Sequence, residues 1–184
     1  MDVSIICSGD SMKKYTLFIL LCLVFTSGCV SQDTVEQGDH VAVDYIGRFE
    51  NGSVFDTSLE QIAVDSGLYS PSRNYEPLNF VAGQGQMIEG FDEAVIGMAV
   101  GEEKTVTIPP EKAYGNYSQD RLFQFPLEEF TNANITPEVG VKVSTMLGTC
   151  TIVDVAEGNV TLDCNHQLAG ETLVFTIQIV SIGE

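Results

Sequence analysis

The chain has 184 residues, enough for one ordinary domain or two small ones, and carries 26 Asp and Glu against 8 Lys and Arg. A formal net charge of −18 argues against nucleic-acid binding, because phosphate contacts depend on clustered Lys and Arg and no basic patch is visible. We interpret the acidity as a solvated surface that keeps the protein soluble.

The first 29 residues have the sequence of an export signal. A charged stretch begins at Met12, an apolar run extends from Tyr15 to Phe25, and small residues precede Cys29. The run has the length of the apolar region of a signal peptide and is short for a membrane span. We therefore expect a signal peptide with a lipobox over residues 1–29. Lipid on Cys29 would then anchor the protein at the extracytoplasmic face of the cell membrane.

Three points about this N-terminal region stay open. The signal could be an ordinary one that releases a secreted protein, or the apolar run could be an uncleaved anchor. Translation could start at Met1 or at Met12, where the charged region begins. Residues 30–37 are short and polar, and we expect them to form a tether.

Short segments with alternating apolar residues follow the tether. The alternation predicts strands over five segments, which are 40–49, 53–56, 80–83, 104–108 and 173–182. Apolar residues on one face predict a short helix over 91–98, and residues 57–79 are expected to form a long loop. Many short strands around one helix predict an α+β fold in which an antiparallel sheet curls on the helix.

The segment 121–163 has a different pattern. It contains strand-like runs at 141–147 and 149–155, and a third run begins at Asn159 and ends at Cys164. The C-terminal strand that follows looks as if it rejoins the first sheet. We therefore expect a small, mainly-β inserted domain over residues 121–163, within a main domain formed by residues 38–120 and 164–184.

Two unmodified cysteines remain once the export signal is removed and Cys29 carries lipid, and their spacing suggests a bond. The run Ala156-Glu157-Gly158 suits a three-residue hairpin loop, with Gly in the left-handed position. That loop would place Ile152 opposite Leu162 and Cys150 opposite Cys164, since a one-residue slip would oppose Ile152 to an aspartate. Export supplies an oxidising setting, so we predict a disulfide, with two half-buried thiols as the alternative.

Conventional catalytic constellations are missing from the sequence. The two histidines, His40 and His166, do not have metal-ligand spacing, and no Gly-x-Ser-x-Gly motif occurs. We therefore expect neither a metal nor a cofactor. Aromatic and apolar residues recur at intervals instead, and each alone could be ordinary core: Tyr45, Phe55, Phe80, Met87, Ile88, Phe91, Tyr114 and Phe175.

Five sequence blocks, in order, resemble FKBP-type peptidyl-prolyl cis-trans isomerases. They are Val43-Asp44-Tyr45-Ile46-Gly47, Asn51 to Ser58 (NGSVFDTS), Phe80 to Phe91 (FVAGQGQMIEGF), Gly97 to Glu102 (GMAVGE) and Ile108 to Gly115 (IPPEKAYG). The later runs 116–118, 125–130 and 165–170 are similar to SlyD-like and long archaeal members. In that group the insert replaces a flap over the active site and acts as a chaperone domain.

The resemblance implies a folding enzyme that acts on proline-containing unfolded polypeptides. We expect a monomer, although the sequence leaves the oligomeric state open. It implies that seven residues surround the proline ring, namely Tyr45, Phe55, Met87, Ile88, Phe91, Tyr114 and Phe175. Phe91 would be the floor, where many relatives carry Trp, and Tyr114 would offer its hydroxyl to a substrate carbonyl. Asp56, at the rim, would orient Tyr45 or polarise the twisting amide. No His-rich tail follows Ile182, so the nickel binding of some SlyD-like relatives is not expected.

Two other functions fit the same residues. The protein could be a polypeptide-binding lipoprotein with little isomerase activity, which the insert favours and the pocket residues oppose. It could also be a structural lipoprotein on an inert scaffold, because a fold does not fix a function. The sequence leaves open whether four asparagines in Asn-x-Ser/Thr motifs carry glycans, namely Asn51, Asn116, Asn134 and Asn159.

Overall fold

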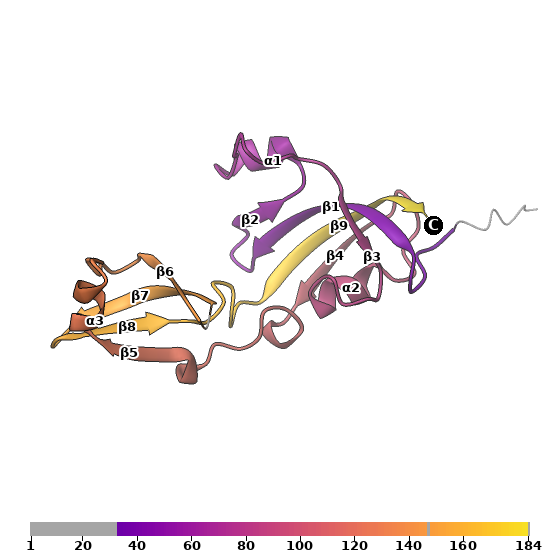
Figure 1. Cartoon of the computed structure of the whole chain (residues 1–184). Helices are drawn as coiled ribbons and strands as arrows, with labels where there is room; N and C mark the ends of the chain where they lie inside the picture. The colour runs from indigo at the N-terminus through magenta and orange to yellow at the C-terminus, as the bar shows by residue number, and fades with distance from the viewer. Residues whose placement is uncertain (1–32, 147, 184) are drawn as a thin grey trace, which may run out of the picture. The chain divides into compact units, whose positions relative to one another are not determined.

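The computed structural model describes residues 33–146 and 148–183 (Figure 1). Cys29 and the rest of the expected signal peptide lie outside the described residues, so the export signal stays a prediction. Within the described ranges, no helix is long and apolar enough to cross a membrane.

Five strands form the first sheet, and all of its neighbouring pairs are antiparallel. Their bounds are β1 His40–Phe49, β2 Val54–Thr57, β3 Leu78–Val81, β4 Glu103–Ile108 and β9 Leu173–Gly183. The order is β2-β1-β9-β4, with β3 also paired to β1. The last strand of the chain therefore runs between the first strand and β4, which Figure 1 shows in yellow.

We call the first sheet and the elements packed against it the first unit. Its core follows from the alternation of apolar residues in its strands. Val41, Val43 and Tyr45 of β1 are buried, and alternate residues of β9 from Leu173 to Ile179 are buried with them. Helix α2, Glu89–Val95, packs Phe91 and other side chains into the same cluster. The predicted α+β class, a curled antiparallel sheet with a short helix, is confirmed.

The predicted tether over residues 30–37 needs a correction. Thr34 forms an isolated bridge with Ala99, and the Val35 amide donates to the Met98 carbonyl at 2.8 Å. Val35 is 1% exposed and belongs to the hydrophobic core. The folded part of the chain therefore already includes Thr34 and Val35. The sequence did not indicate this, because one apolar residue among polar neighbours forms no pattern that predicts burial.

The predicted loop over 57–79 contains a short helix, α1, with bounds Glu60–Asp65. Six residues are too few to show the period of an amphipathic helix, and α1 buries only Ala63. Strand β3 also starts at Leu78, two residues earlier than expected.

The second sheet lies within the segment expected to be inserted. Its strands, in the order β5-β8-β7-β6, have the bounds β5 Leu122–Pro126, β6 Lys142–Thr145, β7 Gly148–Ala156 and β8 Asn159–Asp163. Strand β5 and the helix α3, Leu127–Asn132, were not predicted from the sequence. Phe130 of α3 packs with Ile152, Val160 and Leu162 in a separate core.

A disulfide joins Cys150 of β7 to Cys164, just after β8, with the Cα atoms 4.2 Å apart. The three-residue hairpin loop expected here is wrong. The turn has two residues, Glu157 and Gly158, with φ of +52° and +78°, as a type I′ turn requires. A bulge between Ile152 and Asp154 then shifts the register by one residue, so Ile152 still faces Leu162.

Two connections join the sheets in sequence, and hydrogen bonds tie them together. The outgoing one carries two 3₁₀ helices, η1 Pro110–Lys112 and η2 Gln119–Arg121. Asn165 on the return accepts from the Ser118 amide and donates to the Ser118 carbonyl, each at 3.0 Å. These bonds fix the points where the chain leaves and re-enters the first unit.

Candidate functional site

All eight residues expected around the site line a single cavity of about 560 Å³ in the first unit. They are Tyr45, Phe55, Asp56, Met87, Ile88, Phe91, Tyr114 and Phe175. Leu78, Gln86, Glu89 and Ala113 complete the lining, while Phe80 lies in the core behind Phe91. The wall is thus largely apolar, with a few polar groups that could orient a ligand.

Rings from three strands and one helix build the apolar part of the cavity. The Phe91 ring meets that of Phe175 edge-on with centroids 5.3 Å apart, and that of Tyr45 edge-on at 6.1 Å. Phe55 meets Phe175 in the same way at 5.6 Å. Edge-to-face pairs of this kind are favourable arrangements, so the rings hold one another in place.

Gly47 of β1 is a site residue that sequence analysis did not single out. It pairs with Asp56 on one side and with Phe175 on the other. A Cβ atom at this position would lie 2.7 Å from a Phe55 ring carbon and 3.0 Å from a Phe175 ring carbon. Only glycine lets both rings approach the strand this closely, and its place in a block shared with the family was the available signal.

A polar network occupies one edge of the cavity. The Tyr45 hydroxyl donates to Asp56 Oδ2 at 2.7 Å, and the Thr57 amide donates to Asp56 Oδ1 at 2.9 Å. Arg73 forms an ion pair with Asp56 and donates to the Tyr45 hydroxyl at 3.1 Å. Burial, and then the hydrogen bond and charge of Asp56, raise the pKa of Tyr45 to about 12. The phenol therefore stays protonated and holds the Asp56 carboxylate in a fixed orientation.

Arg73 was not predicted as a site residue. It is the sole Lys or Arg in the segment 57–79, which is the signal that could have found it. Its guanidinium lies 5.4 Å from the centre of the Tyr75 ring, and Tyr75 stacks on Tyr69 at 5.7 Å. Arg73 and Asp56 are both more than a third exposed, so their pairing adds little stability, and its main effect is to orient the carboxylate.

A buried carboxylate shapes the loop that carries Met87 and Ile88. Asp92 of α2 is 6% exposed and accepts from the amides of Gly83 and Gly85 at 2.7 and 2.9 Å. Two backbone donors satisfy this carboxylate, which would be costly to bury alone. The turn formed by Gly83 and Gly85 therefore supports the cavity wall.

Tyr114 lies between η1 and Gly115 and lines the cavity. Its side chain is 39% exposed, and its ring stacks on that of His166, with centroids 4.0 Å apart and planes at 2°. Partial burial and the nearby charge of Asp56 raise the pKa of Tyr114, so its hydroxyl is a donor at neutral pH. Within the described residues, no group of three or more His, Cys, Asp and Glu is placed to hold a metal ion.

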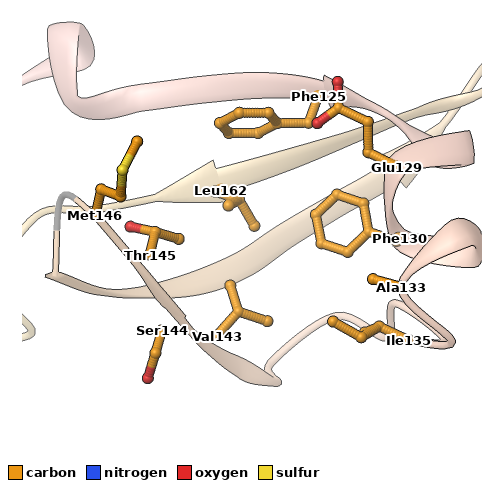
Figure 2. Close-up of a pocket in the computed structure, with 10 residues that line it drawn as sticks. All are labelled: Phe125, Glu129, Phe130, Ala133, Ile135, Val143, Ser144, Thr145, Met146 and Leu162. Atoms are coloured by element: carbon orange, nitrogen blue, oxygen red, sulfur yellow. The ribbon is translucent and has the colours of Figure 1, made fainter.

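The second sheet carries a separate apolar groove of about 320 Å³, which Figure 2 shows. Its apolar lining comes from β5, α3, β6 and β8 and includes Phe125, Phe130, Ile135, Val143 and Leu162. The Met146 side chain at the rim is fully exposed, and Glu129 is the charged residue of the lining. Phe125 and Phe130 line the groove, whereas the nearby Phe123 does not.

Comparisons with known proteins show which family the sequence resembles. The profile of the family described as FKBP-type peptidyl-prolyl cis-trans isomerase matches residues 31–180. The chain is 48% identical over 145 residues to the short-type peptidyl-prolyl cis-trans isomerase of Methanocaldococcus jannaschii, an alignment that covers 79% of this chain and 92% of that protein. It is 33% identical over 113 residues to the FKBP-type isomerase SlyD of Pasteurella multocida, covering 59% of this chain and 56% of that protein.

We predict that Asp56→Asn lowers the pKa of Tyr45 from about 12 toward its ordinary value of 10.0, because it removes a charge and weakens a hydrogen bond that favour the neutral phenol. Burial remains, so the pKa should stay above the ordinary value. A raised folded-state pKa stabilises the fold below pH 10, and this contribution is lost as pH rises through about 12. Ultraviolet titration measures the shift, with Tyr45→Phe identifying the transition. An unchanged titration in Asp56→Asn would contradict the network.

Proposed function

This chain belongs to the FKBP-type peptidyl-prolyl cis-trans isomerase family, and from that premise we propose that its aromatic cavity accelerates rotation about Xaa-Pro bonds by desolvating and twisting them. The protein is an isomerase of proline-containing polypeptides. The observation that carries the mechanism is that eight residues from five separate segments of the chain line one largely apolar cavity, with the Asp56 network at one edge.

The chemistry of rotation suits such a cavity. Partial double-bond character of the C–N bond gives a barrier of about 18–20 kcal/mol. An apolar wall disfavours the charge-separated planar form, and better binding of the twisted form than of either planar isomer lowers the barrier. No nucleophile, acid or metal is needed for this step. Phe91, Tyr45 and Phe175 would enclose the proline ring.

The polar groups would act on the two ends of the twisting amide. Tyr114 lines the cavity, and its hydroxyl has no hydrogen-bond partner among residues 33–146 and 148–183, so it can donate to a substrate carbonyl. The Asp56 carboxylate, held by Tyr45 and Arg73, would polarise the amide as it loses planarity. These two roles explain why a largely apolar cavity keeps Asp56 and the Tyr114 hydroxyl in its lining.

We also propose that the second sheet makes the protein a SlyD-like folding factor that holds unfolded chains. Its groove exposes apolar surface that a lone domain usually buries, and Met146 adds a flexible thioether that adapts to varied side chains. The fitting occupant is an unfolded polypeptide segment with apolar side chains. Capture on this sheet would raise the local concentration of substrate near the cavity.

A lipid anchor at Cys29 is our proposal for where the enzyme works. Support comes from the charged, apolar and small-residue order of the first 29 residues. Only residues 30–33 separate Cys29 from Thr34, a stretch that spans at most about 18 Å. The anchored isomerase would then act on polypeptides close to the extracytoplasmic face of the membrane.

Pocket variants test the isomerase mechanism. We expect Tyr114→Phe and Asp56→Ala each to lower kcat/KM by about two- to ten-fold, the worth of one hydrogen bond, while the protein stays folded. Phe91→Ala should lower it further and cost about 3–5 kcal/mol of unfolding free energy, because Phe91 is 3% exposed. Tyr117→Phe removes a hydroxyl outside the cavity and serves as the control. Unchanged rates in all three pocket variants would refute the assignment.

The role of the second sheet is tested by two substrates. Replacing residues 121–163 with a short loop, together with Cys164→Ser, should preserve turnover of small proline peptides and slow catalysed refolding of a denatured protein. Met146→Glu should weaken binding of unfolded protein, since it puts a charge at the rim of the apolar groove. Val139→Glu, at a residue 66% exposed and outside the groove, is the matched control. An equal loss with both substrates would assign the sheet another role.

Membrane fractionation tests the anchor. Wild-type protein should sediment with membranes, and Cys29→Ser should lose the lipid and be released or retained as an unprocessed precursor. Two acyl chains are expected on the cysteine, because one chain alone binds membranes only marginally. If Cys29→Ser is processed and anchored as firmly as wild type, the lipidation proposal fails. An apolar run that stays uncleaved in wild type would point to a signal anchor.

A further inference from the structure

The Tyr114 side chain needs support that its own backbone does not provide. The adjacent Gly115 is fixed, since its amide donates to the Pro110 carbonyl at 2.7 Å and its carbonyl accepts from the Gly170 amide at 2.8 Å. The ring itself is 39% exposed. A side chain this exposed changes rotamer on a fast timescale unless a neighbour packs against it. Orientation of the hydroxyl therefore depends on what lies against the ring face.

His166 supplies that neighbour. Its imidazole lies parallel to the Tyr114 ring, with centroids 4.0 Å apart and planes at 2°. The imidazole is held in turn by its own connection, because Nδ1 accepts from the Leu168 amide at 3.1 Å and Leu168 packs into the core of the first unit. A neutral ring is needed to accept this bond, and partial burial lowers the pKa of His166. The stack thus links a core residue to a cavity residue.

We propose that His166 is a positioning residue for isomerisation, holding the Tyr114 ring so that its hydroxyl faces the substrate carbonyl. This inference rests on the role proposed above for Tyr114. His166 belongs to the return connection from the second sheet, next to Asn165, which is bonded to Ser118. The orientation of one cavity residue therefore depends on the chain segment that closes the insertion.

A double-mutant cycle on the full chain tests the proposal. His166→Ala should lower kcat/KM for a proline tetrapeptide by about three- to ten-fold in the wild-type background. In the Tyr114→Phe background, which lacks the hydroxyl to be positioned, the same change should lower it by less than about two-fold. His166→Phe, which keeps a planar ring, should recover most of the activity. Gln167→Ala, at the exposed neighbouring residue, is the control and should behave as wild type.

A structural role would give a different result. If His166 only caps the turn at Leu168, His166→Ala would lower kcat/KM equally in both backgrounds, and His166→Asn, which keeps an acceptor but lacks the ring, would restore activity. Either result would overturn the proposal. So would a His166→Ala variant that turns over the peptide at the wild-type rate while the Tyr114→Phe variant is slowed. Wild-type turnover by Tyr114→Phe would show instead that the role of the hydroxyl is wrong, and the positioning role would be lost with it. If the His166→Ala variant does not fold, the same double-mutant cycle is carried out with His166→Asn and His166→Phe.

Discussion

The pairing of β1 with β9 is the constraint on which the rest of the structure depends. These two strands run antiparallel along the full length of β1, from His40 opposite Gly183 to Phe49 opposite Leu173. One face of both strands is apolar, so their pairing forms both the core and the cavity wall. In this pairing Gly47 lies opposite Phe175, and Tyr45, two residues earlier in β1, lies on the same face as Gly47. A one-residue slip would send these residues to the opposite face and remove the wall.

That pairing also explains how a second sheet can be carried inside the chain. Because β9 returns between β1 and β4, the connection between β4 and β9 can carry the second sheet as an excursion from the first. The bonds between Ser118 and Asn165, and between Gly115 and Gly170, close this excursion at its base. Within it, the bond between Cys150 and Cys164 joins β7 to the end of β8. The insertion is thus closed at its base and cross-linked within, and it carries a small core of its own.

The cavity places a small amount of polarity in a mostly apolar setting. Asp56 is held at its edge by a hydrogen bond from Tyr45 and an ion pair with Arg73, and exposure of the ion pair means that the pair contributes little to stability. The main effect of the ion pair is to orient the carboxylate, since a carboxylate held from both sides needs no reorganisation when a substrate amide twists beside it. Asp92 plays the corresponding structural part, because its two backbone bonds fix the turn that precedes Met87.

The sequence by itself determined the α+β class and most strands of the first sheet, because alternation is a local property that can be read without the tertiary structure. Its resemblance to the family indicated eight of the twelve residues that line the cavity. The sequence also indicated the cysteine pair. The predicted length of the hairpin turn was wrong, but a bulge at Val153 restored the register. Only the tertiary structure decided that Val35 belongs to the core, that Arg73 meets Asp56, and that His166 stacks on Tyr114. Each of these contacts joins residues far apart in the chain, so its existence depends on how strands and loops pack and not on any local pattern.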